Sequence, residues 1–591
     1  MLICLSGTIV YLNSLGNSFV WDDELLVTGN PSIRSLASIP SLFLHRLAAQ
    51  LGGNFYRPVQ LASYAVDYSI WGYNPAGYHL TNLLIHLANA VILFLIILNC
   101  TGRRTLAFLT GLFFVIHPVQ TEAVAYISGR ADILSGFFIL VSLLLFVRSG
   151  KKFTGSFSRT VTAGSLGFFI LALLTREAAV ILPLLALLCG RYVSSASRGN
   201  DHRRILQNRS AFISLFLIAL VYLLLRYLFL SVTGGTISSN PYPFSARFLS
   251  SFKVILNYFK ILLLPSPLRM ERVIAIETHP FSLSALPPLL LLTGLAVFTV
   301  RVFKRSPPFF FGIAWFFAAL LPYLNWFPLN AEMAEHWLYL PSAGFFFLLA
   351  WTVIEVEKRH PIPTRTFLIL IVACWAILTV DRNRDWKNNL TIYTRTARDS
   401  PGSPRANYNL GNLYLNRGDP DRAVAYLKRS RTIKPGDFKT RRSLGKALLA
   451  QGDPERSIEE LKVAVSIRPS SAEAWSELGV ACSLGGRHEE AIKFLQTAVE
   501  LDPGSARIHN NLASVYTRMG NFAEALIESD RALELDPDLL EARFNRGVIH
   551  YHRGDMEKAR TRFRDIIRTD PAFRPARIWL EKVRSSDQSF F

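Results

Sequence analysis

Two adjacent aspartates, Asp22 and Asp23, directly follow an apolar stretch at the start of the chain. Neighbouring carboxylates at the mouth of a membrane-embedded site suit general-base catalysis, or contact with a metal or other cation. A base at this place would take a proton from an acceptor hydroxyl while a lipid phosphate departs. A hydrated acidic loop that orients the first apolar segment is the alternative, and the pair by itself favours that alternative.

Three basic residues are candidates for binding the phosphate of a lipid-linked donor. Arg57 precedes a proline, Arg130 lies in a Gly-Arg-Ala-Asp segment, and His336 follows a glutamate. Guanidinium groups match phosphate oxygens in charge and geometry. Each residue could also anchor a loop at the membrane interface. Five further polar residues could hold these cations or orient an acceptor: His117, Glu122, Asp132, Glu177 and Glu335.

A polar stripe marks the second apolar region. His79, Asn82, His86 and Asn89 are spaced by three or four residues, which places them on one face of a helix. Such a stripe either packs against a neighbouring helix or contributes to a site, and the spacing does not decide between the two. The five cysteines show no metal-ligand spacing. We therefore expect no protein-bound metal, while a divalent cation at the acidic pair stays open.

The elements that must position these residues are membrane helices. The chain has 591 residues, half of them hydrophobic, with a mean hydropathy of +0.27. Up to about residue 380 the apolar residues form long runs, and a helix that crosses a bilayer needs roughly 20 of them. The net charge of +21 does not indicate nucleic-acid binding. Many of the Arg and Lys residues stand in short loops between apolar runs, where they set membrane topology.

We predict eleven spans, at about 1–20, 78–99, 104–119, 131–148, 160–174, 177–190, 210–231, 282–302, 308–325, 337–356 and 364–380. Basic clusters near 103, 148–152, 198–204, 301–305 and 358–365 belong on the cytoplasmic side. To keep all of them there, 164–189 must be a hairpin of two short helices that turns at 175–177. The segment 252–264 must then be an interfacial or re-entrant helix. This topology places the candidate site and the C-terminal region on the periplasmic or lumenal side of a bacterial inner membrane or of the endoplasmic reticulum.

A repeat of 34 residues fills the C-terminal third. Prolines recur at 401, 435, 469, 503, 537 and 571, and glycines at 418, 452, 486, 520 and 554. This period, with Leu-Gly early and Pro late, is the signature of the tetratricopeptide repeat, a helix–turn–helix unit. We predict five repeats at 404–573, preceded by a linker and half-repeat at 381–403 and followed by a capping helix and tail at 574–591. Such arrays present a groove to proteins or peptides, here an acceptor, and a simple spacer is the alternative.

The ordered motifs resemble those of the transmembrane and tetratricopeptide repeat-containing O-mannosyltransferases, which are GT-C glycosyltransferases. The resemblance rests on the segments Phe19–Glu24, Tyr56–Pro58, Pro75–Asn82, His117–Val124, Gly129–Asp132, Arg176–Glu177 and Ala334–Phe345. It covers nearly the whole chain. It implies an all-α, multi-pass GT-C membrane enzyme at 1–380 that passes a sugar, mannose in that family, from a polyprenyl-phosphate carrier to Ser or Thr hydroxyls. It also implies that Asp22 and Asp23 are the catalytic element.

The chain departs from this family at two places. The family usually has Ala-Glu-Arg where this chain has Ala334-Glu335-His336, so a fixed positive charge is missing there. The segment 232–280 is less similar, which leaves acceptor recognition open. Two alternatives to the glycosyltransferase are a membrane-anchored repeat scaffold without catalysis and a lipid-linked oligosaccharide ligase. The intact acidic pair argues against the scaffold, and the short last outer loop at 326–336 argues against the ligase.

Overall fold

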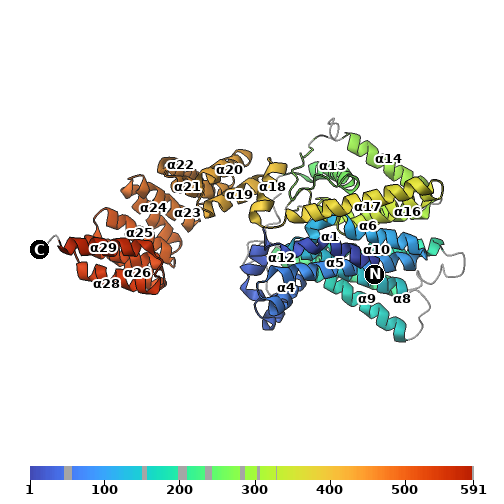
Figure 1. Cartoon of the computed structure of the whole chain (residues 1–591), viewed down its shortest axis with the longest axis horizontal. Helices are drawn as coiled ribbons and strands as arrows, with labels where there is room; N and C mark the ends of the chain where they lie inside the picture. Colours follow the sequence, from blue (N-terminus) through green and yellow to red (C-terminus); the bar gives the residue numbers. More distant parts are fainter. Residues whose placement is uncertain are drawn as a thin grey trace. The chain divides into compact units, whose positions relative to one another are not determined.

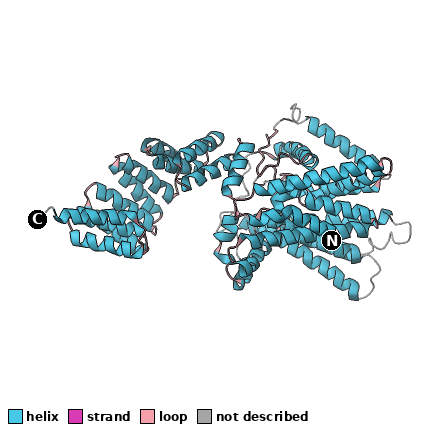
Figure 2. Ribbon diagram, viewed as in Figure 1, coloured by secondary structure: helices cyan, strands magenta, loops and turns pink. Residues whose placement is uncertain are grey.

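A computed structural model of the chain describes residues 1–44, 56–149, 156–196, 209–232, 242–277, 279, 286–302, 306–327, 329 and 331–588. These residues form helices, turns and loops, and none of them belongs to a β-strand (Figure 2). They divide into two compact units, Met1–Ser400 and Pro401–Phe591. The all-α class predicted from the sequence is confirmed.

The first unit is a bundle of mostly apolar helices (Figure 1). Its central helix α5 packs against α6 and α8, and α6 also packs against α16. The helices are α1 (Leu2–Tyr11), α2 (Ile39–Leu44), α4 (Pro58–Trp71), α5 (Pro75–Thr101), α6 (Arg104–Ile116), α7 (Thr121–Val124), α8 (Arg130–Ser149), α9 (Ser156–Thr175), α10 (Leu182–Ala196), α12 (Arg209–Val232), α13 (Phe244–Leu263), α14 (Leu286–Val302), α15 (Pro307–Leu320), α16 (Pro341–Glu357), α17 (Pro361–Arg384) and α18 (Asn389–Asp399).

Several of these helices can cross a membrane by length and composition. Four are both long and apolar enough: Pro75–Thr101, Ile127–Ser149, Arg209–Leu228 and Pro361–Arg384. A fifth span is formed if Arg104–Ile116 and Pro118–Val124, which meet at 53°, count as one. Shorter apolar helices cover Leu2–Gly16, Thr160–Thr175, Leu286–Val302 and Pro307–Tyr323. The multi-pass class is therefore supported, and the count of eleven spans stays a prediction.

The break that the topology required near 175–177 is present, while the interfacial or re-entrant placement of 252–264 stays a prediction. The α9 helix ends at Thr175, Arg176 is extended (φ −157°, ψ 135°), and a 3-10 turn, η7 (Glu177–Ile181), leads into α10. The segment predicted as an interfacial helix at 252–264 is part of α13, which begins earlier, at Phe244. Of the basic residues used for the topology, those at 151, 152, 198, 203, 204, 304 and 305 lie outside the described residues.

The second unit is a stack of helix pairs, as the 34-residue period predicts. Its helices are α19 (Pro404–Asn416), α20 (Pro420–Ile433), α21 (Phe438–Gln451), α22 (Pro454–Ile467), α23 (Ala472–Leu484), α24 (His488–Leu501), α25 (Ala506–Arg518), α26 (Phe522–Leu535), α27 (Leu540–His552), α28 (Met556–Thr569) and α29 (Arg574–Gln588). Each pair contacts the next in the chain. The unit has hydrophobic cores of its own, so it can fold as an independent array.

Each repeating proline has a second role besides ending a helix. Its carbonyl accepts a hydrogen bond from a side chain six residues later, at distances between 2.6 Å and 3.2 Å in five units. The donors are Asn407, Arg441, Trp475, His509 and Arg543, and Arg577 makes the same contact in the capping helix. A carbonyl that no helix can satisfy is thereby paired at the start of every unit.

A second periodic feature is a close contact between the two helices of each pair. A Cβ atom added to Gly479 would lie 2.6 Å from Cγ of Leu495, and Gly411 and Gly445 face Leu427 and Leu461 in the same way. In the fourth repeat the glycine is replaced by Ala513, and the equivalent leucine position holds Ser529. The added methyl group and the smaller partner compensate each other in volume.

We therefore expect Gly479→Ala to destabilise the array. Overpacking costs about 1–3 kcal/mol, which exceeds the gain in helix propensity of up to about 1 kcal/mol. The sign should reverse in a Leu495→Ser background, because the space that the new methyl group needs is then empty. Thermal unfolding of the repeat unit, residues 401–591, measures both effects. Equal effects of Gly479→Ala in the two backgrounds would contradict the complementarity.

Candidate active site

Trp21, Asp22 and Asp23 form the acidic loop, and its first residue has a strained backbone. Trp21 has a φ of +54°, which a side chain larger than glycine rarely adopts and which costs roughly 1–2 kcal/mol. Two residues of α18 hold it there. The Oδ1 atom of Asn389 accepts a hydrogen bond from the Trp21 N–H at 2.9 Å, and the Tyr393 ring meets the indole edge to face at 5.1 Å. The segment predicted as a linker and half-repeat thus fixes the shape of the acidic loop.

Asp23 is fully buried, and both of its carboxylate oxygens accept hydrogen bonds. It accepts hydrogen bonds from the Val20 N–H at 3.0 Å, the Ser128 N–H at 2.8 Å and the Ser128 hydroxyl at 2.5 Å. Burial raises the pKa of Asp23 to about 7, although these hydrogen bonds act in the opposite direction. Asp23 therefore fastens the acidic loop to the start of α8.

Asp22 differs from its neighbour because its side chain is exposed. Its backbone N–H donates to the Tyr126 hydroxyl at 3.1 Å. The Tyr126 ring stacks on Trp386, with ring centroids 5.0 Å apart. Of the two carboxylates that the sequence singled out, Asp22 is thus the one that an incoming hydroxyl can reach.

Arg57 lies in an ion pair with Glu177, as the sequence analysis had allowed. Arg57 directly precedes α4, and its Nη2 atom is 3.0 Å from Oε1 of Glu177 on η7. Arg226 of α12 approaches the other carboxylate oxygen at 3.8 Å. All three side chains remain partly exposed, at 15%, 29% and 24%.

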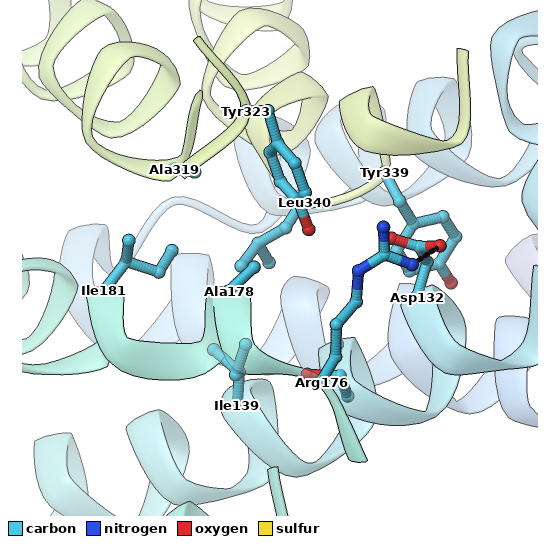
Figure 3. A pocket seen from close by; sticks show the side chains of 11 residues that line it. Asp132, Ile139, Arg176, Ala178, Ile181, Ala319, Tyr323, Tyr339 and Leu340 are labelled. Atoms are coloured by element: carbon cyan, nitrogen blue, oxygen red, sulfur yellow. Dashed lines mark hydrogen bonds and ion pairs between the residues drawn. The ribbon is translucent and has the colours of Figure 1, made fainter. Parts of the chain in front are cut away.

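A small pocket is lined by Arg176 and Ala178, the two residues that flank Glu177 in the chain (Figure 3). Arg176 reaches across it to form an ion pair with Asp132, and the Tyr323 ring stands over the guanidinium at 5.6 Å. Ala178, Ile181 and Leu340 give the pocket an apolar wall. The two charges are largely buried, which strengthens their mutual attraction.

Buried Glu122 and partly exposed His336 form a second pair. Both carboxylate oxygens of Glu122 are occupied, one by the His336 Nδ1 atom at 2.7 Å and one by its backbone N–H at 3.1 Å. Burial lowers the pKa of His336, but the carboxylates of Glu122 and Asp132 outweigh it and the net shift is upward. The histidine is therefore held in the cationic form to higher pH than usual.

Glu335, the residue before His336, connects its own segment to two others. Its Oε1 atom accepts from the Arg269 backbone N–H at 2.5 Å and from Arg272 at 3.1 Å, and its Oε2 atom from Arg382 at 3.3 Å. Glu335 itself is fully buried. It fixes the segment after α13 and the end of α17 around His336.

Arg130 has a structural position, which differs from our expectation. Its side chain has no exposed surface and pairs with Asp67 at 2.6 Å. It also donates to Oδ1 of Asn82 at 2.7 Å and to the Tyr78 carbonyl at 2.9 Å. A guanidinium that is enclosed in this way has no surface for a donor phosphate, so the predicted phosphate-binding role of Arg130 is not supported.

His117 also serves the fold. Its Nδ1 atom accepts from the Val119 N–H at 3.2 Å, and its Nε2 atom lies 3.1 Å from the Leu262 carbonyl. It stands at the bend between α6 and the following turn, where Pro118 interrupts the helical hydrogen bonding. The residue links α13 to this bend and lies away from exposed surface.

The polar stripe of α5 is buried and packs against neighbouring helices. His86 Nδ1 lies 2.8 Å from the Tyr339 hydroxyl, and Asn89 donates to the same hydroxyl at 2.9 Å. Asn82 donates to the carbonyls of Val124 and Tyr126 at 3.2 Å. The packing interpretation of the stripe therefore fits these three residues.

Sequence reasoning missed four residues of the site: Tyr126, Ser128, Arg176 and Arg226. Arg176 stood beside a chosen residue at the break between two helices, and this position could have identified it. No sequence pattern identifies Ser128 and Tyr126 as site residues, because their hydrogen-bond partners in the acidic loop are more than 100 residues away in the sequence. Among the described residues, no group of three or more His, Cys, Asp or Glu is placed to hold a metal ion.

Fold and site together define a class of protein: a multi-pass helical membrane protein with an acidic first loop, followed by tetratricopeptide repeats. Family models described as tetratricopeptide repeat match residues 382–438, 442–506 and 504–572. The repeats also resemble the crystal structure of MamA protein, at 26% identity, 28% coverage of this chain and 92% of that chain, with a TM-score of 0.25.

The curated relatives carry a more particular name. A protein O-mannosyl-transferase of Caenorhabditis elegans is 26% identical over 441 residues, which are 71% of this chain and 60% of the relative. Human protein O-mannosyl-transferase TMTC3 is 24% identical over 472 residues, 72% of this chain and 50% of the relative. The resemblance to this O-mannosyl-transferase family is confirmed. The chain spans about half to three fifths of the length of these relatives.

Proposed function

We propose that the chain is a GT-C membrane glycosyltransferase that passes mannose from a polyprenyl-phosphate carrier to Ser or Thr hydroxyls of proteins. The proposal rests on the different environments of the two carboxylates in the acidic loop. One carboxylate is exposed at the surface, and the other is buried and fixes the loop. The names of the curated relatives support the same reaction.

In the proposed mechanism Asp22 is the general base. It removes the proton of the acceptor hydroxyl as that oxygen attacks the anomeric carbon of the sugar. The bond from this carbon to the phosphate oxygen breaks, and the lipid phosphate leaves as an anion. Asp23 acts as a positioning residue through Ser128. A divalent cation at the acidic loop stays a proposal that metal removal would test.

The leaving phosphate needs positive charge more than it needs a proton. Arg57 is the first candidate to provide it, because its guanidinium is partly exposed. His336 is the second, and Arg176 is added because it lines the neighbouring pocket. Glu122, Asp132 and Glu177 hold these three cations, one carboxylate to each, so the positive charges stand in defined positions.

The proposed role of His336 predicts a pH dependence. Its raised pKa means that the imidazolium persists to higher pH than that of an ordinary histidine and is lost as the pH rises through that pKa. Transfer should therefore fall on the alkaline side. His336→Arg, which keeps the charge at every pH, should remove this alkaline limb. Glu122→Gln should move the limb to lower pH, and a pH–rate profile unchanged in both variants would exclude His336 from this role.

The acceptor protein is expected to use the groove of the repeat array, which must then lie on the same side of the membrane as the acidic loop. A reporter fused after Asp385 should behave as exported to the periplasm or lumen. The reason is that an odd number of spans with basic loops inside leaves the C-terminal part outside. A cytoplasmic signal from this fusion would contradict the proposed topology.

Comparing the glycoproteins of cells that have or lack the chain tests the proposed function. Mass spectrometry of exported proteins should find hexose on Ser or Thr residues only where the intact chain is present. An identical set of glycopeptides in both cell types would reject the proposed transferase and favour a scaffold.

A further inference from the structure

One charged residue of the first unit is unusually placed. Arg226 lies six residues before the end of α12 (Arg209–Val232), within the candidate span Arg209–Leu228, whose window is 17% buried. The same helix exposes large apolar side chains, among them Leu220 at 55% exposure, Leu224 at 55% and Tyr227 at 71%. An ionisable group on such a helix is costly and usually marks a functional site.

The surroundings of Arg226 carry an excess of positive charge. Glu177 is the carboxylate that both Arg57 and Arg226 face, at 3.0 Å and 3.8 Å. Two guanidinium groups share one carboxylate, so the three side chains carry a net charge of +1. The distance from Arg226 to Glu177 is too long for a hydrogen bond, and the Arg226 Nη1 atom donates to the Tyr222 hydroxyl at 3.2 Å instead.

We propose that Arg226 and Arg57 together bind the phosphate of a lipid-borne ligand, whose isoprenoid chain lies along the exposed apolar side of α12. The inference rests on the proposed function and assigns its donor a binding place. Guanidinium pairs match phosphate oxygens, and their partial exposure leaves room for these oxygens. The α12 helix exposes apolar side chains and also carries Arg226, which shares Glu177 with Arg57, so it offers both surfaces that a ligand with an apolar chain and an anionic head requires.

Glu177 has a defined part in this arrangement. It is anionic, as a phosphate is, and it occupies the N–H groups of Arg57 that a phosphate would use. Phosphate binding therefore displaces part of this ion pair. Removing the negative charge of Glu177 should strengthen phosphate binding, whereas a purely structural Glu177 would weaken it when replaced.

The test measures binding of a photoreactive polyprenyl phosphate that carries no sugar to the purified full-length chain in lipid nanodiscs. Arg226→Gln and Arg57→Gln should each weaken labelling on the order of tenfold, as the loss of a charge-assisted hydrogen bond predicts. Arg209→Gln, at the other end of the same helix, is the matched control and should bind like the wild type. Glu177→Gln should bind the probe more tightly than the wild type.

Competitors distinguish the sources of the phosphate. Unlabelled polyprenyl phosphate should displace the probe, and inorganic phosphate and phosphatidic acid should not. Displacement by phosphatidic acid with equal strength would overturn the proposal in favour of a general anionic-lipid site. If Arg226→Gln binds normally while Arg57→Gln does not, the inference about Arg226 fails and the proposed donor site stands. A wild-type chain that never binds the probe would contradict the proposed function itself.

Discussion

Asp22→Asn is expected to reduce the rate of sugar transfer by roughly 10²–10⁴-fold, which is the usual contribution of a positioned general base. The substitution keeps the shape of the side chain and removes its charge. Because Asp22 is exposed and Asp23 carries the hydrogen bonds that hold the loop, the variant should fold and reach the membrane in normal amounts. The measurement is initial-rate transfer at matched protein concentration.

Asp23→Asn is the control for this prediction, since it changes the neighbouring residue in the same way. It should lower transfer less than Asp22→Asn, because an amide oxygen can still accept from Ser128. Its main effect should be on stability. The pKa of Asp23 is raised from the ordinary value of 3.8 to about 7, so the wild type loses stability as the pH rises between these two values, and the neutral variant avoids this loss. Equal transfer by the wild type and both variants would make the acidic pair structural.

Arg130→Gln is expected to destabilise the first unit by about 3–5 kcal/mol, the usual cost of leaving one partner of a buried ion pair without the other. Asp67 would keep its charge in a place with almost no exposed surface. The variant should unfold at lower temperature in detergent, as followed by fluorescence-detected size-exclusion chromatography after heating.

A double variant separates this effect from a role in catalysis. Replacing both Arg130 and Asp67 by apolar residues of similar size should restore part of the stability, because no uncompensated charge then remains. Arg57→Gln is the comparison, since its partly exposed pair should matter less for folding. If Arg130→Gln were as stable as the wild type but bound polyprenyl phosphate weakly, Arg130 would be a phosphate ligand after all.

Local patterns explain what the sequence could predict. The 34-residue spacing of prolines predicts the repeats, because equivalent residues make equivalent contacts in every unit and the pattern therefore recurs in the sequence. The same period also contains the side chains that pair with the proline carbonyls, from Asn407 to Arg577. The break between helices at Arg176 was predicted from the positions of the basic loops. One long span there would have put the next basic loop on the non-cytoplasmic side.

Contacts between distant segments explain what could not be predicted. Asp22 and Asp23 are equivalent in the sequence, and only Ser128, which is 105 residues from Asp23, separates their roles. The sequence does not reveal that Arg130 is buried, because its ion-pair partner Asp67 lies on another helix. The segment predicted as a linker and half-repeat, 381–403, has its residues up to Ser400 in the first unit, and the contacts of Asn389 and Tyr393 with Trp21 had no signal in the sequence.

Transfer in a purified system is the most direct test of Asp22 as the general base. The full-length chain in nanodiscs would be incubated with labelled polyprenyl-phosphate mannose and a Ser/Thr-containing peptide. We expect labelled peptide with the wild type, roughly 10²–10⁴-fold less with Asp22→Asn, and no labelling of a peptide whose Ser and Thr residues are replaced by Ala. Label on the peptide at equal rates with the wild type and Asp22→Asn would contradict the role of Asp22 as the base.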